Sequence, residues 1–143
     1  MVWIASDHAG FELKKRIAVW LRKNNFEYQD LGTDSEEAVD YPIYAHQVAD
    51  KVARNNADRG ILLCSSGQGM AMAANRHRGV RAAVAWEKEI AMMSRQHNDS
   101  NVLVLPADHI EVKDAIETVK EWLSTDFTKE ERHARRIQEI EKV

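Results

Sequence analysis

Short apolar stretches alternate along this chain with longer segments in which apolar residues recur every three or four positions, and this alternation constrains the fold most. Short apolar runs are typical of buried strands, and the longer spacing is typical of helices with one buried face. The predicted strands are Val2 to Ala5, Phe26 to Asp30, Ile61 to Leu63, Val80 to Ala85 and Asn101 to Leu105. The predicted helices are Phe11 to Asn24, a helix that begins near Pro42, Met70 to Asn75, Glu87 to His97, Ile110 to Leu123 and Lys129 to Lys142.

Strands and helices that alternate in this way predict an α/β fold, a three-layer sandwich in which helices cover both faces of a parallel sheet. We expect five strands in the flavodoxin-like order 2-1-3-4-5, followed by one further helix at the C-terminus. A chain of 143 residues is long enough for a single domain spanning residues 1–143. Ligands bind such sheets beyond the carboxyl ends of the strands, here at the switch point between the first and third strands. The residues predicted there are Asp7-His8 and Cys64-Ser65-Ser66.

The third strand ends at Cys64, the only cysteine, and Ser65-Ser66-Gly67-Gln68-Gly69 follows before a helix begins. The glycines allow the backbone to approach a ligand, and the N–H groups and dipole of the helix N-terminus favour an anion. The same N-terminus is predicted to lower the pKa of the thiol. A cysteine at a strand end is more often a small buried hydrophobic residue, so a structural role is the alternative.

Three familiar phosphate-binding motifs do not fit this loop. A P-loop needs a lysine after its second glycine, but Met70 follows Gly69. A dinucleotide fingerprint needs a third glycine where Met72 stands, and a cysteine-phosphatase loop needs an arginine in place of Met70. The loop is therefore predicted to be an anion cradle with a thiol and without a nucleotide signature.

Composition excludes several classes of function. The formal net charge of −3 does not suggest a protein that binds nucleic acid or a membrane surface. No apolar run approaches the length of a transmembrane helix. A single cysteine excludes an internal disulfide framework and favours a cytoplasmic location. The six histidines lack the spacing of metal ligands, so we expect no metal.

Two further groups of polar residues have both a structural and a functional interpretation. Asp7 is a favoured residue just before a helix, and His97-Asn98 closes the fourth helix, where a histidine also suits the helix dipole. The pattern does not place His97 relative to Cys64. Four basic residues, Arg76, His77, Arg78 and Arg81, are predicted to form a solvated patch.

The last predicted helix is highly charged. Arg132 and Arg136 stand four residues apart on one face, which suits either a solvent-exposed helix or a pair of guanidinium groups that bind a phosphate. Its apolar stripe consists only of Ile137, Ile140 and Val143. A helix with so narrow a stripe would be more stable when packed on a partner subunit.

Several blocks in one order along nearly the whole chain resemble the type B ribose-5-phosphate isomerases, which are grouped with the galactose-6-phosphate isomerase subunits. The blocks are Ser6-Asp7-His8-Ala9-Gly10, Asp40-Tyr41-Pro42, Cys64 to Gly69 through Ala73-Ala74-Asn75-Arg76, Arg95-Gln96-His97-Asn98-Asp99, and Arg132-His133 with Arg136. The resemblance implies a Rossmann-like fold and a cofactor-free aldose–ketose isomerase that works as a homodimer or a dimer of dimers.

The resemblance also implies a role for individual residues. Cys64 is the base that moves a proton between C1 and C2, since Met70 stands where some members carry a catalytic glutamate. Ser66 and the loop amides of Gly67, Gln68 and Gly69 hold the enediolate oxygens. His97 and Asp7 assist ring opening, Asn98 lies nearby, and Tyr41 lines the pocket. The phosphate is bound by His8, Arg132 and Arg136, some of which reach across the dimer.

Two positions depart from the family pattern. Ser65 stands where most members have glycine, and Asp108 stands where many carry an arginine that contacts the phosphate. Ribose 5-phosphate and ribulose 5-phosphate are the expected sugars. Another aldose, either a six-carbon phosphate or an unphosphorylated sugar, is the alternative, and a non-catalytic flavodoxin-like binding module is a second one.

Overall fold

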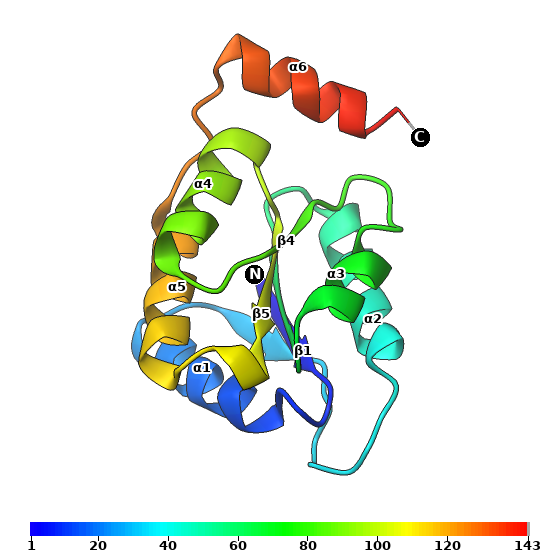
Figure 1. Cartoon of the computed structure of the whole chain (residues 1–143), viewed down its shortest axis with the longest axis vertical. Helices are drawn as coiled ribbons and strands as arrows, with labels where there is room; N and C mark the ends of the chain where they lie inside the picture. Colours follow the sequence, from blue (N-terminus) through cyan, green and yellow to red (C-terminus); the bar gives the residue numbers. More distant parts are fainter. Residues whose placement is uncertain (143) are drawn as a thin grey trace.

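The computed structural model describes residues 1–142 and contains a five-stranded parallel sheet with helices on both faces (Figure 1). The strands are β1 (Val2–Ser6), β2 (Tyr28–Asp30), β3 (Arg59–Cys64), β4 (Ala82–Val84) and β5 (Val102–Pro106). The helices are α1 (Phe11–Lys23), α2 (Tyr41–Arg54), α3 (Gln68–Ala74), α4 (Lys88–Asn98), α5 (Val112–Ser124) and α6 (Glu131–Ile140), with a short 3₁₀ turn, η1 (Ala107–His109). The predicted α/β class is confirmed.

The strand order is β2-β1-β3-β5-β4, so the expected order 2-1-3-4-5 is wrong at its last two positions. β5 pairs with β3 along five residues, from Gly60 opposite Val102 to Cys64 opposite Pro106. All five residues of β5 are buried, whereas the three residues of β4 are only partly buried. A strand that is apolar on both faces suits the interior of a parallel sheet, which leaves the short β4 at the edge.

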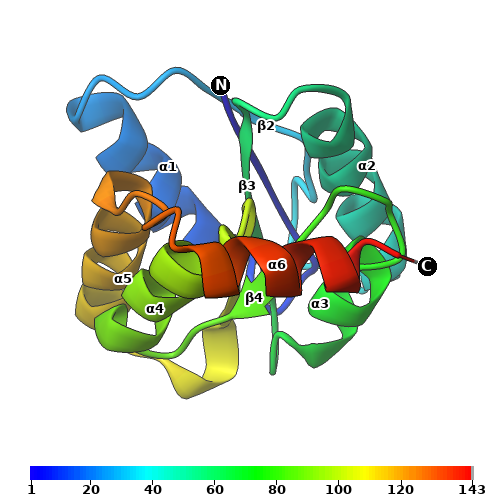
Figure 2. The same ribbon diagram turned by 90° about the horizontal axis from the view of Figure 1, so that it is seen from above.

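Two hydrophobic layers hold the helices on the sheet. One layer contains residues of α1, α4 and α5, with the fully buried Trp122 as its largest side chain. The other contains residues of α2 and α3, including Val48 and Met70. Figures 1 and 2 show the two helical groups on opposite sides of the sheet. The core therefore has the three layers expected from the sequence.

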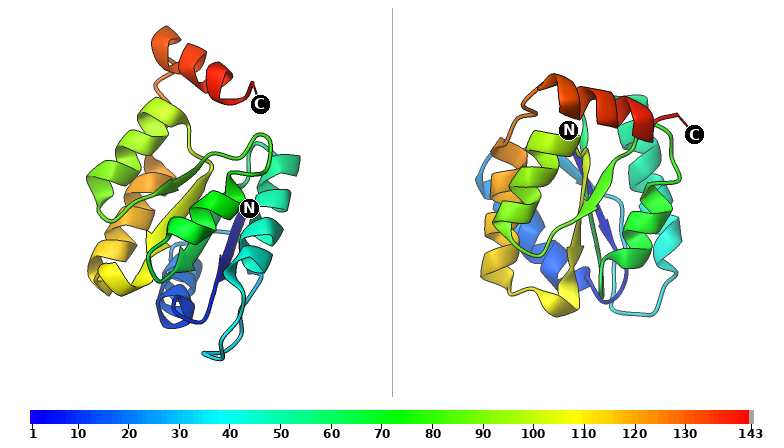
Figure 3. Two further views of the ribbon diagram at one scale, coloured as in Figure 1. Left: turned by 45° about the vertical axis from the view of Figure 1, so that its right-hand side comes forward. Right: turned by 45° about the horizontal axis from the view of Figure 1, so that its top comes forward.

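Helix α6 lies apart from these layers and crosses the amino ends of the strands (Figures 2 and 3). Within α6, His133 is the one buried residue. Ile137 of the predicted apolar stripe is partly buried and Ile140 is exposed, while Val143 lies outside the described residues. Among residues 1–142, no helix has the length and apolar character needed to span a membrane.

Candidate active site

The carboxyl ends of β1 and β3 lie side by side and bring together Asp7 and Cys64. The backbone N–H of Asp7 donates to the carbonyl oxygen of Leu63 at 3.1 Å, which aligns the residues that follow the two strands. The switch point predicted from the sequence therefore falls between β1 and β3 despite the change in the order of β4 and β5.

The loop after Cys64 is shaped by two glycines. Gly67 has a φ of +79°, and a Cβ atom there would lie 3.2 Å from a methyl group of Val84. Gly69 lies directly under the ring of Tyr41, which leaves no room for a side chain. Ser66 is exposed, and its hydroxyl accepts a hydrogen bond from the N–H of Gln68 at 3.4 Å. Tyr41 therefore lies beside the predicted anion cradle.

Cys64 is 5% exposed, and burial raises the pKa of its thiol above the ordinary value. Backbone N–H groups of Met70, Gly67 and Ser66 act in the opposite direction, and the nearby charge of Asp7 raises the pKa further. The expectation that the N-terminus of α3 leaves a lowered thiol pKa is therefore wrong. The physical reason is that loss of solvation of the thiolate outweighs the local amide dipoles.

Asp7 and His8 are both held by backbone contacts. Asp7 is buried, and its Oδ1 accepts from the N–H of Gly10 at 3.1 Å, so it also serves the start of α1. Nδ1 of His8 accepts from the N–H of Val39 at 3.2 Å. Because Nδ1 is the acceptor in this bond, the proton of the neutral ring is assigned to Nε2, which can donate to an anionic oxygen.

Asp108 lies at the same end of the sheet. Its backbone N–H donates to the carbonyl oxygen of Ser65 at 3.0 Å, so η1 is in direct contact with the loop that follows Cys64. Asp108 belongs to η1, which directly follows β5, the neighbour of β3. Asp7 and Asp108 both add negative charge to this end of the sheet, which is unfavourable for a phosphate unless cations are supplied.

His97, Asn98, Arg132 and Arg136 lie at the opposite end of the sheet. The carbonyl oxygen of Asn98 accepts from Nε of Arg81, the residue just before β4, at 2.9 Å. A helix that connects parallel strands runs against them, so the last turn of α4 lies near the amino ends. β3 has six residues, and its five steps of about 3.3 Å separate the two ends by roughly 17 Å. One chain therefore carries the predicted site as two separate groups.

The second group is organised by a contact between α4 and α6. The rings of His97 and His133 are stacked with centroids 4.6 Å apart and planes 20° apart. Burial lowers the pKa of His133, and electrostatic interactions with Arg132 and His97 lower it further. Arg132 and Arg136 are exposed, and Nε of Arg132 pairs with Oε2 of Glu130 at 3.1 Å.

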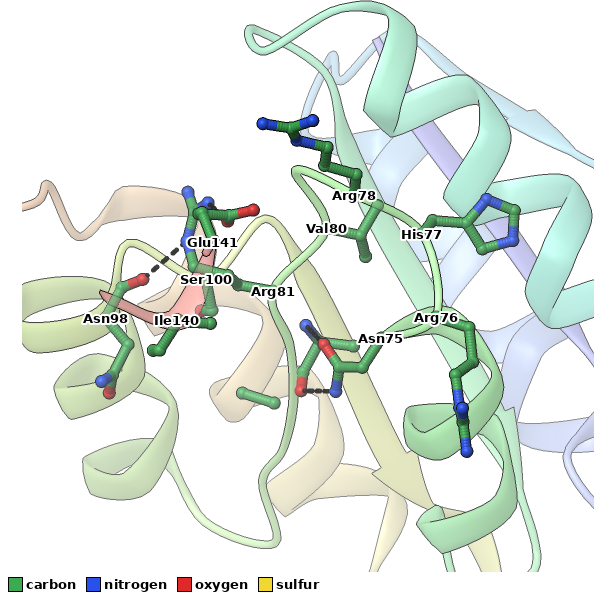
Figure 4. Close-up of a pocket in the computed structure, with 12 residues that line it drawn as sticks. Asn75, Arg76, His77, Arg78, Val80, Arg81, Asn98, Ser100, Ile140 and Glu141 are labelled. Atoms are coloured by element: carbon green, nitrogen blue, oxygen red, sulfur yellow. Dashed lines mark hydrogen bonds and ion pairs between the residues drawn. The ribbon is translucent and has the colours of Figure 1, made fainter. Parts of the chain in front are cut away.

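Reasoning from the sequence missed the role of Arg81. Its side chain is only 17% exposed, and it lines a pocket of about 650 Å³ between α6 and the segment that joins α3 to β4 (Figure 4). The prediction that Arg81 belongs to a solvated patch is therefore wrong. The partners of Arg81 are the carbonyl oxygens of Asn98 and Asp99 and the carboxylate of Glu141, all distant in the sequence, so no local pattern could have revealed them. Within residues 1–142, no cluster of three or more histidine, cysteine, aspartate or glutamate side chains is placed to hold a metal.

Comparison with known proteins gives consistent similarities. The family model described as Ribose/Galactose Isomerase matches residues 2–140. The ribose-5-phosphate isomerase B of Escherichia coli (strain K12) is 42% identical over 134 residues, which cover 94% of this chain and 89% of that protein.

Solved structures show the same similarity. A ribose 5-phosphate isomerase of Thermotoga maritima matches with a TM-score of 0.96 and 48% identity, over 99% of this chain and 97% of that chain. The ribose-5-phosphate isomerase B of Mycoplasma genitalium, in a crystal structure with bound ribulose-5-phosphate, matches with a TM-score of 0.95 and 40% identity, over 99% of this chain and 93% of that chain. Both similarities extend over the two groups of polar residues described above.

Proposed function

Because the chain belongs to the ribose/galactose isomerase family and is thus an aldose–ketose isomerase, we propose that it interconverts ribose 5-phosphate and ribulose 5-phosphate through an enediolate, without a cofactor. The observation that carries this proposal is the position of Cys64 beside Asp7, at the carboxyl ends of adjacent strands and under the glycine loop. A base and a set of N–H donors at one point are what proton transfer next to a carbonyl requires.

In the proposed reaction, the Cys64 thiolate takes the proton from C2 of the open-chain aldose and returns it to C1. The hydroxyl proton on O2 passes to O1, so the product differs from the substrate only in the position of the carbonyl. The hydroxyl of Ser66 and the amides of Gly67 to Gly69 stabilise the negative enediolate oxygens. One such donor is typically worth about 10²–10³ in rate, and a positioned base about 10²–10⁴.

The carboxyl ends of the strands lack the remaining groups, and we propose that a second copy of the chain supplies them. In a homodimer, His97 and Asn98 of one protomer then meet Cys64 of its partner, with His97 and Asp7 assisting ring opening. Arg132 and Arg136 of the same protomer join the partner's His8 at the phosphate. A dimer of dimers would contain the same unit twice.

The surface around β4 supports this assembly. β4 is a short edge strand, and exposed apolar side chains flank it on both sides, namely Met72 on α3, Met93 on α4 and Trp86 between β4 and α4. Exposed apolar groups along an open strand edge favour pairing with another chain. A twofold axis at this edge and perpendicular to the strands would place the carboxyl ends of one sheet beside the amino ends of the other.

The test is a panel of aldoses and aldose phosphates, assayed for ketose formation in the presence of a chelator, with Cys64→Ala as the comparison. The wild type is expected to convert ribose 5-phosphate and to incorporate solvent deuterium at C2. Cys64→Ala should lose both activities and still bind the sugar phosphate, because loss of one sulfur is a small packing change. Near-normal turnover by Cys64→Ala would make Cys64 a core residue, and inhibition by the chelator would contradict a metal-free mechanism.

One observation favours a second substrate class. The carboxylate-bearing Asp108 is fixed to Ser65 at the site, where it can accept hydrogen bonds from sugar hydroxyls. A six-carbon or unphosphorylated aldose is therefore the alternative, and the same panel distinguishes it. Binding without turnover of any sugar would instead support a flavodoxin-like binding module.

We further propose a cytoplasmic location for this chemistry. The mechanism needs the single cysteine as a free thiol, and the cytoplasm keeps thiols reduced.

A further inference from the structure

Arg81 connects the two segments that carry the second group of site residues. Its Nε donates to the carbonyl oxygen of Asn98 at 2.9 Å, and Nη2 donates to that of Asp99 at 2.9 Å. On the other side, Nη1 pairs with Oε1 of Glu141 at 2.8 Å. One guanidinium group therefore bonds both to the end of α4, which bears His97, and to the residue that follows α6.

Helix α6 has few other contacts that could hold it in place. His133, near its first turn, is buried and stacked on His97. At the other end, Ile140 is exposed and, together with Glu141, lines the pocket of about 650 Å³ (Figure 4). Ile137 is half-buried between these two ends, and Glu141 attaches the far end, because its Oε2 also accepts from the N–H of Gly79 at 3.1 Å.

We propose that Arg81 is a positioning residue that holds the end of α4 and the end of α6 in one arrangement, and so aligns His97 with the Arg132–Arg136 pair. This inference rests on the proposed function, in which these residues act at the partner's Cys64. Arginine suits the task because its planar fork presents five donors, whereas lysine offers one compact charge. Alignment matters because a misplacement of about 1 Å can cost about 10²-fold in rate.

Helix α6 is attached through His133 and Glu141, and these positions predict whether Arg132 or Arg136 moves more when the bond between Glu141 and Arg81 is lost. Arg132 is adjacent to His133, so the stacked end of α6 still holds it. Arg136 lies between His133 and Glu141, one turn from the first anchor, and a helix that pivots about His133 carries Arg136 further than Arg132. Loss of the Glu141 contact should therefore act mainly through Arg136.

The first test is Glu141→Gln, which removes the ion pair and leaves the bonds from Arg81 to α4 intact. Its KM for ribose 5-phosphate should rise about 10-fold with kcat nearly unchanged, as expected when only phosphate binding is lost. Arg81→Lys should in addition lower kcat, because the end of α4 is released as well. In an Arg136→Ala background Glu141→Gln should have almost no further effect on KM, whereas in an Arg132→Ala background it should keep its effect.

A matched control comes from Asp58, a buried carboxylate at the same end of the sheet. It accepts from Nε1 of Trp3 at 2.8 Å and from Nδ2 of Asn55 at 3.1 Å, and these partners lie outside α4 and α6. Asp58→Asn should lower the thermal unfolding temperature without changing kcat or KM. Equal kinetic effects of Asp58→Asn and Glu141→Gln, or full additivity of Glu141→Gln with Arg136→Ala, would overturn the proposal.

Two readouts do not depend on turnover. Hydrogen exchange of the α6 amides should become faster in Glu141→Gln and Arg81→Lys than in the wild type and in Asp58→Asn. The affinity for inorganic phosphate, measured by calorimetry, should fall in the same two variants. A wild type that isomerises no sugar would refute the proposed function, while unchanged exchange and phosphate affinity in both variants would refute the role of Arg81.

Discussion

At the scale of single residues, the proposed base is a thiol that is buried, with a pKa that is raised rather than lowered. Burial and the charge of Asp7 both favour the neutral form of Cys64, and only backbone N–H groups favour the thiolate. A raised pKa makes the thiolate scarcer but more basic, which suits proton removal from a weak carbon acid. The same loop amides that favour the thiolate can then serve the enediolate.

This environment predicts the pH dependence of Cys64 reactivity. Because the pKa of the thiol is raised, its rate of alkylation by iodoacetamide should increase with pH and reach its midpoint above about 8.5, the ordinary value for cysteine. Asp7→Asn removes a charge that raises this pKa, so the midpoint should move to lower pH. Cys64 is the only cysteine, so labelling followed by mass spectrometry reports on it alone. A midpoint below the ordinary value would mean that the amides of α3 outweigh burial.

Asp108 makes the second prediction at this scale. If its carboxylate faces the phosphate, Asp108→Arg should lower KM for ribose 5-phosphate and steepen its salt dependence, because the repulsion costs on the order of 1 kcal/mol or more. Asp108→Asn, which removes only the charge, should give a smaller change in the same direction. If the natural substrate is unphosphorylated, the wild type should convert a free aldose with a kcat/KM at least comparable to that for ribose 5-phosphate. Strong preference for ribose 5-phosphate, with no response to Asp108→Arg, would mean that Asp108 faces away from the site.

At the scale of elements, local patterns predicted what local interactions decide. β3 and β5 are continuous apolar runs and lie where they were expected, within one residue or two. β2 begins later than predicted, at Tyr28, because Phe26 closes α1 instead of starting the strand. The N–H of Phe26 donates to the carbonyl oxygen of Leu21, and its ring stacks on Trp20 with the centroids 5.6 Å apart. The exchange of β4 and β5 did have a local signal, because β5 consists entirely of apolar residues, as in a strand buried on both faces, whereas β4 is short and only partly buried.

The loop before α3 gives a prediction at this scale. Gly67→Ala places a Cβ on a backbone with a φ of +79° and against Val84 and Val104. Such strain costs roughly 1–3 kcal/mol of stability, and relief of it should turn the amides of the cradle away from the substrate. We expect kcat to fall by about 10²-fold or more while the protein remains folded at the assay temperature, since one oxyanion donor is worth that much. Circular dichroism and steady-state kinetics together check this, and unchanged kcat in a folded variant would exclude the loop amides from catalysis.

At the scale of the whole molecule, the candidate site could be predicted only in part. The residues near Cys64 follow from the rule that ligands bind at the switch point of a parallel sheet. His97 and Arg136 do not, because the last turn of α4 and helix α6, which follows α5, both lie at the amino ends of the strands. No pattern within one chain predicts where a residue lies relative to a second copy of the chain. Only the resemblance to the isomerase family therefore assigned the residues around Cys64 and those around His97 to one site.

A mixture of two variants tests whether the two groups of site residues come together across a dimer. If Arg136 acts in the partner's site, a dimer of one Cys64→Ala chain and one Arg136→Ala chain has one intact site and one site with both defects. Random pairing then restores about a quarter of the wild-type sites, because half of the C₂ dimers are mixed and each has one good site. The assay uses ribose 5-phosphate well below the KM of Arg136→Ala, where that variant alone is nearly silent.

The control mixture pairs Cys64→Ala with Asp7→Asn. Both residues lie at the carboxyl ends of one chain's strands, so every site of a mixed dimer keeps one defect and activity should stay at the level of the separate variants. Subunit exchange is verified in both mixtures with chains of different mass. Recovery with Arg136→Ala but not with Asp7→Asn indicates a site divided between two chains, once circular dichroism shows that all three variants are folded, since Asp7 is buried and Arg136 is exposed. No recovery in either mixture, despite exchange, would mean that one chain builds the whole site and that α6 must move about the length of β3 to reach Cys64.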